Sequence, residues 1–351
     1  MKTGSFVFGL LILLFSSCTK EEPQTLDDIS FHPLFKVNVL FPSQGLGDRS
    51  FVDDVYEAVE LVSQDVDFEV DYIVPASIED GQVWLQNYVE SESVPSFIIV
   101  TGNQFTPAVN ALQGDFHGHK IMLIEGIADE HDGLASVLYY AYSPSYIAGY
   151  LSAQLTENCR ASSIGGFDAP FLAQFVDGFE EGVRDAGGLV VSRYFIAEDF
   201  SGFEMPDSAY RLTKQIMGDC DLIYSLATGS NFGIINALRE SALQKYAIGI
   251  NSDQSWMGYQ VVTGSVINNF RDIIRDYVEQ FKNSQFRSGS FYLSMEGHHT
   301  QFLINTHVLT QEPADELIQI ALLKEKAYWG MKGFGHLSGF FSANTNLNFL
   351  K

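Results

Sequence analysis

Short runs of apolar, β-branched residues alternate with helical patterns along most of the chain. In the first half such runs predict strands at 35–41, 68–74, 96–100, 120–124 and 135–141, with helices near 51–63, 80–90 and 106–113. After a predicted helix at 143–157, a second series predicts strands at 162–167, 189–195, 221–227, 246–250 and 265–269, with helices near 171–186, 206–218 and 232–243. This alternation is typical of βαβ units, so we predict an α/β protein with parallel sheets.

Two similar series in one chain predict two lobes with a cleft between them. We expect residues 34–157 to form the first lobe, with about 270–290 returning to it, and 158–269 to form the second, with about 291–327 added. A helix near 270–283, a strand at 301–305 and a helix near 313–327 would cross between the lobes, and 328–351 stay unplaced. Because open parallel sheets bind ligands at the carboxyl ends of their strands, the candidate loops follow residues 41, 100, 124, 167, 195, 227 and 250.

The N-terminal residues have the pattern of a bacterial export signal. An apolar run at residues 6–15 follows Lys2, is too short to span a bilayer and predicts a signal peptide over residues 1–17. Cys18, directly after "FSS", resembles the lipidated cysteine of a lipobox; plain secretion is the alternative. Residues 18–33 would then be a lipid anchor and disordered tether, which would hold the protein on a membrane of the cell envelope, facing the periplasm or the outside.

Charge and motifs narrow the class of function. The formal net charge of −24, from 44 acidic and 20 basic residues, argues against nucleic acid as a partner. The sequence contains no nucleophile elbow, P-loop or H-E-x-x-H motif, and neither His117/His119 nor His298/His299 repeats a metal-ligand spacing. We therefore predict no catalytic residues, no metal and no cofactor.

Two further cysteines precede strands of the second lobe. Cys159 comes just before its first predicted strand and Cys220 just before its third. In the usual 2-1-3 strand order these strands are neighbours, so a disulfide is an open possibility.

Five segments of the chain together resemble one known family. They are "GLGDRSFVDDVYEA" (45–58), "SPSYIAGYLSAQL" (143–155), "SIGGFDAPFLAQFVDGFEEGV" (163–183), "SLATGSNFGIINALRE" (225–240) and "AIGINSDQ" (247–254). They are similar to motifs of the basic membrane protein family, also called PnrA-like lipoproteins, and are collinear over about residues 36–305. The resemblance implies a type I periplasmic-binding-protein-like fold, a small-molecule ligand, best known as a purine nucleoside, and an ABC permease as partner.

The resemblance also implies which residues face the ligand. In that family two aromatic rings hold the base, and these fall on Phe51 and on Phe203, with Phe200 as the alternative. Four polar family positions are altered here, at Val52, Glu125, Asn251 and Ile267, which weakens the nucleoside expectation because unmatched buried polar groups discriminate strongly. The predicted ligand-binding set is Asp48, Ser50, Phe51, Val52, Glu125, Phe203, Gly229, Asn251 and Asp253.

Some of these residues have a structural interpretation as well. Ser50 and Asp53 have the spacing of a helix-capping pair, and Asp253 could cap a turn instead of binding ligand. The function predicted from all of this is a lipid-anchored solute-binding protein for a small polar, ring-containing ligand, with a purine nucleoside as one candidate. The alternatives are a ligand sensor or surface receptor and, less favoured, a hydrolase on the same fold.

Overall fold

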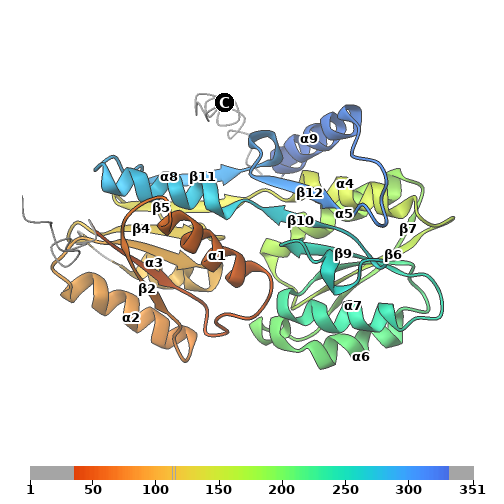
Figure 1. Ribbon diagram of the computed structural model, residues 1–351, viewed down its shortest axis with the longest axis horizontal. Helices are drawn as coiled ribbons and strands as arrows, with labels where there is room; N and C mark the ends of the chain where they lie inside the picture. The colour runs from red at the N-terminus through yellow and green to blue at the C-terminus, as the bar shows by residue number, and fades with distance from the viewer. Residues whose placement is uncertain (1–34, 113, 115, 332–351) are drawn as a thin grey trace, which may run out of the picture. The chain divides into compact units, whose positions relative to one another are not determined.

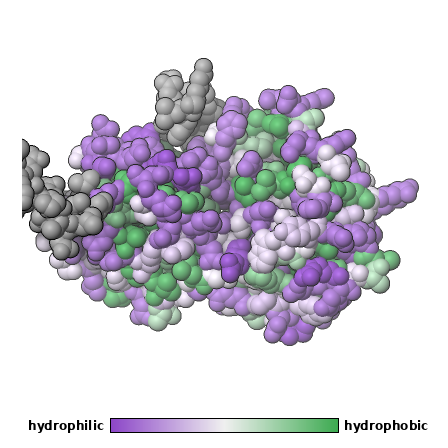
Figure 2. All heavy atoms as spheres, in the orientation of Figure 1, coloured by the Kyte–Doolittle hydropathy of each residue, from purple (hydrophilic) through white to green (hydrophobic). Residues whose placement is uncertain are grey.

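The computed structural model describes residues 35–112, 114 and 116–331. The predicted signal peptide (1–17), the lipidation site Cys18, the tether to residue 33 and the tail beyond residue 331 lie outside these residues. Within the described ranges, no helix combines the length and the apolarity needed to cross a membrane. Hydrophilic side chains predominate on the face drawn in Figure 2, with hydrophobic residues in small groups between them, which agrees with the strongly acidic composition.

The first sheet has six parallel strands in the order β11-β5-β4-β3-β1-β2. Its strands are β1 Lys36–Leu40, β2 Glu69–Ile73, β3 Phe97–Thr101, β4 Lys120–Ile124, β5 Leu134–Tyr139 and β11 Gly289–Leu293. Helices α1 (Phe51–Ser63) and α8 (Phe270–Lys282) cover one face, and α2 (Ile78–Ser91) and α3 (Thr106–Ala111) cover the other (Figure 1). Residues along β1 alternate between these two hydrophobic layers, because successive side chains of a strand point to opposite faces.

The second sheet repeats this plan in the order β12-β10-β9-β8-β6-β7. Its strands are β6 Arg160–Gly165, β7 Leu189–Phe195, β8 Leu222–Leu226, β9 Tyr246–Asn251, β10 Val262–Asn268 and the antiparallel β12 Thr300–Ile304. Helices α4 (Tyr142–Ala153), α5 (Ala173–Asp185) and α9 (Asp315–Trp329) cover one face, and α6 (Pro206–Ile216) and α7 (Asn231–Arg239) the other. The prediction of an α/β protein with two doubly wound, mostly parallel sheets is confirmed.

The chain passes between the two sheets after β5, after β10 and between β11 and β12. These crossings are tied to one another by backbone hydrogen bonds, from Tyr140 N to Leu293 O (2.7 Å) and from Asn269 N to His299 O (2.8 Å). Strand β11 was not predicted, because it is a five-residue edge strand with four half-buried residues and lacks a fully apolar run.

Helices α4 and α5 pack against each other at unusually close range. Glycines lie at their contact: a Cβ placed on Gly149, Gly178 or Gly182 would come within 2.1–2.4 Å of a backbone carbonyl oxygen of the facing helix. Helix α4 itself is buried along almost its whole length. The close approach therefore depends on positions that have no side chain.

The possible disulfide between Cys159 and Cys220 is not formed: both are buried, free thiols. The strands β6 and β8 that follow them are neighbours, as expected. However, Cys159 packs in the layer under α4 and α5, whereas Cys220 packs under α6 and α7 and its sulfur contacts Ser162 Oγ at 3.0 Å. The two side chains lie on opposite faces of one sheet, so their sulfurs cannot be joined.

Candidate functional site

A cavity of about 830 Å³, including its open mouth, lies between the carboxyl ends of the two sheets. Each of the seven loops singled out from the sequence contributes to its wall, as expected for ligand sites of open parallel sheets. The first lobe provides Pro42, Gln44, Asp48, Phe51, Val52, Gly102, Asn103, Gln104 and Glu125; the second provides Phe171, Leu172, Phe175, Phe200, Phe203, Glu204, Leu226, Thr228, Ile250 and Asn251.

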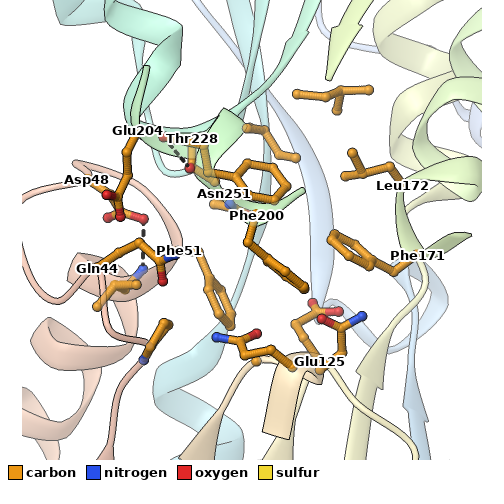
Figure 3. Close-up of a pocket in the computed structure, with 18 of the residues that line it drawn as sticks. Gln44, Asp48, Phe51, Glu125, Phe171, Leu172, Phe200, Glu204, Thr228 and Asn251 are labelled. Atoms are coloured by element: carbon orange, nitrogen blue, oxygen red, sulfur yellow. Dashed lines mark hydrogen bonds between the residues drawn. The ribbon is translucent and has the colours of Figure 1, made fainter. Parts of the chain in front are cut away.

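Aromatic rings dominate the second lobe's side of the cavity. Phe171, Phe200 and Phe203 form one cluster in which ring centroids are 6.2–6.4 Å apart. Phe51 enters from the first lobe, and its ring packs edge-on against Phe270 at 5.6 Å. Figure 3 shows Phe51, Phe200 and Phe171 pointing into the same space, with Glu125 at its edge. Rings arranged in this way offer apolar faces to a flat, ring-containing molecule.

Asp48, not Ser50, caps helix α1. Its carboxylate accepts hydrogen bonds from the backbone N–H groups of Ser50 (2.9 Å), Val52 (3.2 Å) and Asp53 (3.2 Å). Burial nevertheless raises the pKa of Asp48 to about 6, against the opposing effect of these N–H groups. The expected capping pair of Ser50 and Asp53 is therefore replaced by a carboxylate two residues before Ser50, while Asp53 itself accepts from Gly47 N and Arg49 N.

Ser50 instead joins the two lobes. Its hydroxyl, fully buried, donates to Ile250 O (3.4 Å) and accepts from Asn251 Nδ2 (3.0 Å). Beside it, the Ser252 hydroxyl donates to Arg49 O at 3.0 Å. These three hydrogen bonds, which we call the latch, close one side of the cavity by tying the loop before α1 to the end of β9.

Replacing Ser50 with alanine should loosen the latch, because it removes two of its bonds and leaves the Asn251 amide unpaired. The bond to Ile250 O is long (3.4 Å), so we count the loss as that of one net hydrogen bond, about 0.5–1.5 kcal/mol, and ligand affinity should fall roughly two- to tenfold. Titration calorimetry with a ligand identified by a thermal-shift screen of small solutes would measure the change in affinity. Ser63→Ala is the matched control, because the Ser63 hydroxyl bonds only to Glu60 O within the same helix; equal affinities for the two variants would show that the latch has no role in binding.

Glu125 follows β4 and lies half-buried in the cavity wall. Its backbone has φ 59°, in the left-handed region that non-glycine residues rarely adopt, and Thr228 (41°) and Asn251 (66°) share this feature. Asn268 Nδ2, from the second sheet, donates to Glu125 Oε1 at 3.2 Å. Burial raises the pKa of Glu125 to about 8. Strained backbone and a perturbed carboxyl at one place are features that cluster at functional sites.

The raised pKa of Glu125 should make the ligand-free protein depend on pH. The folded state holds a proton that the unfolded chain releases between about pH 4.5 and 8, so this group's contribution to stability is lost as pH rises through that window. Glu125→Gln should therefore melt close to wild type at about pH 4.5 and progressively further above it as the pH rises to about 8.5. Melting curves at both pH values test this; a constant difference would contradict it, and Glu316→Gln, an exposed carboxyl on α9, is the control.

Not every residue predicted from the sequence lines this cavity. Ser50 and Gly229 lie behind the wall; the Cβ position of Gly229 is 3.1 Å from Phe203 O and 3.7 Å from Asp48 Cα. Asp253 is exposed, and its carboxylate accepts from Ser255 N (2.9 Å), which fits the expected turn cap. Ile267 and Asp253 border a second, more polar cavity of about 860 Å³ between α1, β10 and α8.

Several residues that line the cavity were not predicted from the sequence. Asn103, Gln104 and Thr228 come directly after strands, where a search for polar residues at carboxyl ends would have found them. Phe171 and Glu204 belong to short 3-10 segments after β6 and β7, which have no periodic signal. Their positions depend on the tertiary fold.

The fold is shared with a known class of proteins. Two parallel sheets with a cavity between their carboxyl ends are the type I fold of periplasmic solute-binding proteins. A solute-binding protein of an ABC transporter from Aeropyrum pernix superposes with a TM-score of 0.70 at 18% identity, covering 88% of this chain and 90% of that chain. A periplasmic solute-binding protein of an ABC transporter from Actinobacillus succinogenes, solved with bound D-allose, gives a TM-score of 0.60 at 14% identity. The match covers 78% of this chain and 99% of that chain.

The chain belongs to the family described as "ABC transporter substrate-binding protein PnrA-like", which matches residues 35–322. An uncharacterized lipoprotein of Pyrococcus furiosus is 21% identical over 271 residues, 74% of this chain and 68% of that protein. Basic membrane protein D of Borreliella burgdorferi is 24% identical over 164 residues, 45% of this chain and 47% of that protein. The family resemblance drawn from the motifs is confirmed.

Proposed function

We propose that this protein binds a small polar, ring-containing solute between its lobes, outside the cytoplasmic membrane, and delivers it to an ABC permease. The observation that carries the proposal is the cavity between the carboxyl ends of the two sheets, with aromatic rings contributed by both lobes. Membership of a substrate-binding family supports the role in import. The names of relatives as lipoproteins support attachment through Cys18.

Binding would need no covalent chemistry. Phe51 and the Phe200–Phe203 pair supply faces for stacking, while Gln104, Asn103 and Glu125 supply polar groups along the cavity wall. Closing the lobes around the solute would exclude water and strengthen these polar contacts. The latch already joins the lobes on one side, so it would favour the closed arrangement that a permease recognises.

A purine nucleoside is the candidate that the family suggests. Val52 lies in the cavity wall at 4% exposure, where the family's asparagine could make paired amide contacts that valine cannot. Ile267 borders the second cavity and does not reach the first. The family's nucleoside contacts are thus only partly available here, so a search for the ligand must include compounds other than nucleosides.

A thermal-shift screen tests the proposal. The purified protein is melted alone and with nucleosides, free bases, sugars, amino acids and aromatic amines. A ligand at a hundred times its dissociation constant stabilises the folded state by about 2.7 kcal/mol, which raises the melting temperature measurably. Absence of a shift with every class of small solute would contradict a solute-binding role, and turnover of any compound would favour the hydrolase alternative.

A further inference from the structure

The ionisable groups around the cavity are all acidic. Asp48, Glu125 and Glu204 carry the carboxylates of its wall. None of the described residues in that wall is a lysine, an arginine or a histidine. An anionic solute would therefore meet acidic groups and no counter-ion, which is unfavourable in a partly dehydrated cavity.

The three carboxylates are not equally available to a ligand. Asp48 already accepts three backbone N–H groups at the start of α1. Glu204 is exposed at the rim. Glu125 lies deeper, and of its two oxygens only Oε1 has a hydrogen bond, from Asn268 Nδ2. Within the described part of the chain no ion pair neutralises Glu125, so Oε2 is an open acceptor in the wall.

Aromatic rings surround the same space. Phe51 and Phe171 point into it beside Glu125 in Figure 3. The faces of aromatic rings carry negative electrostatic potential and attract cations within about 6 Å of the ring centre, by about 2 kcal/mol or more where water is excluded. An acceptor carboxylate and several ring faces therefore share a preference for a positively charged group.

We propose that the solute is a cation: a small ring-containing molecule whose protonated amine is held by Glu125 and whose ring lies against the phenylalanines. This inference rests on the proposed function and specifies its substrate class. Glu125 would set selectivity by charge, and the aromatic wall would set it by shape. Because burial raises the pKa of the empty site's Glu125 to about 8, the carboxyl would lose its proton on binding near pH 7, at a cost of about tenfold in affinity.

Two sets of compounds that differ mainly in charge test the proposal on the full chain. One set is 5′-amino-5′-deoxyadenosine, adenosine and adenosine-5′-carboxylic acid; the other is phenethylamine, 2-phenylethanol and phenylacetate. Calorimetry should show that in at least one set the amine binds tenfold or more tightly than the neutral compound, and that the carboxylate does not bind. Neutral compounds that bind as tightly as the amines, or no binding in either set, would overturn the inference.

Two variants test whether Glu125 is the residue that gives the preference for the amine. Glu125→Gln should reduce the affinity for the amine at least tenfold and leave that for the neutral compound within about threefold. Glu316→Gln removes the same charge far from the cavity wall and should change neither. An amine preference that survives Glu125→Gln would overturn the inference. The wild-type comparison stands by itself if the Glu125 variant folds poorly. Neutral solutes that bind in the wider screen would leave the proposed function intact, whereas no binding there at all would remove it.

Discussion

Replacing Gly182 with valine is expected to lower the free energy of unfolding by about 3 kcal/mol or more, the largest effect we predict for a single substitution. A Cβ at this position would lie 2.1 Å from Tyr146 O and 2.9 Å from Tyr150 N, both backbone atoms of α4. Backbone of a buried helix cannot move aside as a flexible side chain can. Helix α5 would have to shift away from α4, which would loosen the hydrophobic layer that both helices share.

The alanine variant makes the test more specific. In a free helix, alanine is more stable than glycine by about 1 kcal/mol, so Gly182→Ala would stabilise the protein if only helix propensity mattered. The close contact predicts the opposite sign. Gly218→Ala is the control, because nothing lies within 4 Å of its added Cβ. In urea unfolding, the midpoint of Gly182→Ala should lie below that of wild type, whereas the midpoint of Gly218→Ala should not. A Gly182→Ala midpoint at or above wild type would contradict the packing described.

Removing the Phe51 ring should weaken solute binding about ten- to a hundredfold. A stacked ring contributes on the order of 1–3 kcal/mol, and Phe51 is the ring that the first lobe contributes to the cavity wall. Phe51→Leu is the more informative change, because leucine can still pack against Phe270 while it offers no aromatic face. Phe51→Ala removes both.

Calorimetry with the best ligand of the screen measures this loss. Tyr259→Ala serves as a control, since Tyr259 is an exposed aromatic residue that packs edge-on against His307 and does not line the cavity. Wild-type affinity in both Phe51 variants would mean that the ring takes no part in binding.

Much of the fold was predictable because local patterns of apolar and polar residues indicate its strands and helices. The continuous apolar runs of β3 and β8 reflect strands buried on both faces, and the 3.6-residue period of α1 and α8 reflects one buried stripe. Strand β11 was missed because an edge strand with one covered face gives only a short, mixed pattern. The cysteine prediction was wrong because strand order alone does not specify which face of the sheet a side chain takes.

The site was predictable in part. The loops that form the cavity follow from the βαβ plan, whereas Phe51, Val52, Glu125 and Asn251 were implied by the family resemblance, and all four line the cavity. The role of Ser50 in joining the lobes could not be predicted from the neighbouring sequence, because its hydrogen-bond partners lie about 200 residues away along the chain. The positive φ angles at Glu125 and Asn251 leave no trace in a pattern of apolar and polar residues.

A crystal structure of the protein grown with the best hit of the screen tests the central claim most directly. We predict density for one solute in the cavity between the carboxyl ends of the two sheets, with its ring against Phe51 and at least one of Phe200 and Phe203. Density for the solute in the second cavity beside Asp54 and His299, with the first cavity holding only water, would contradict the account.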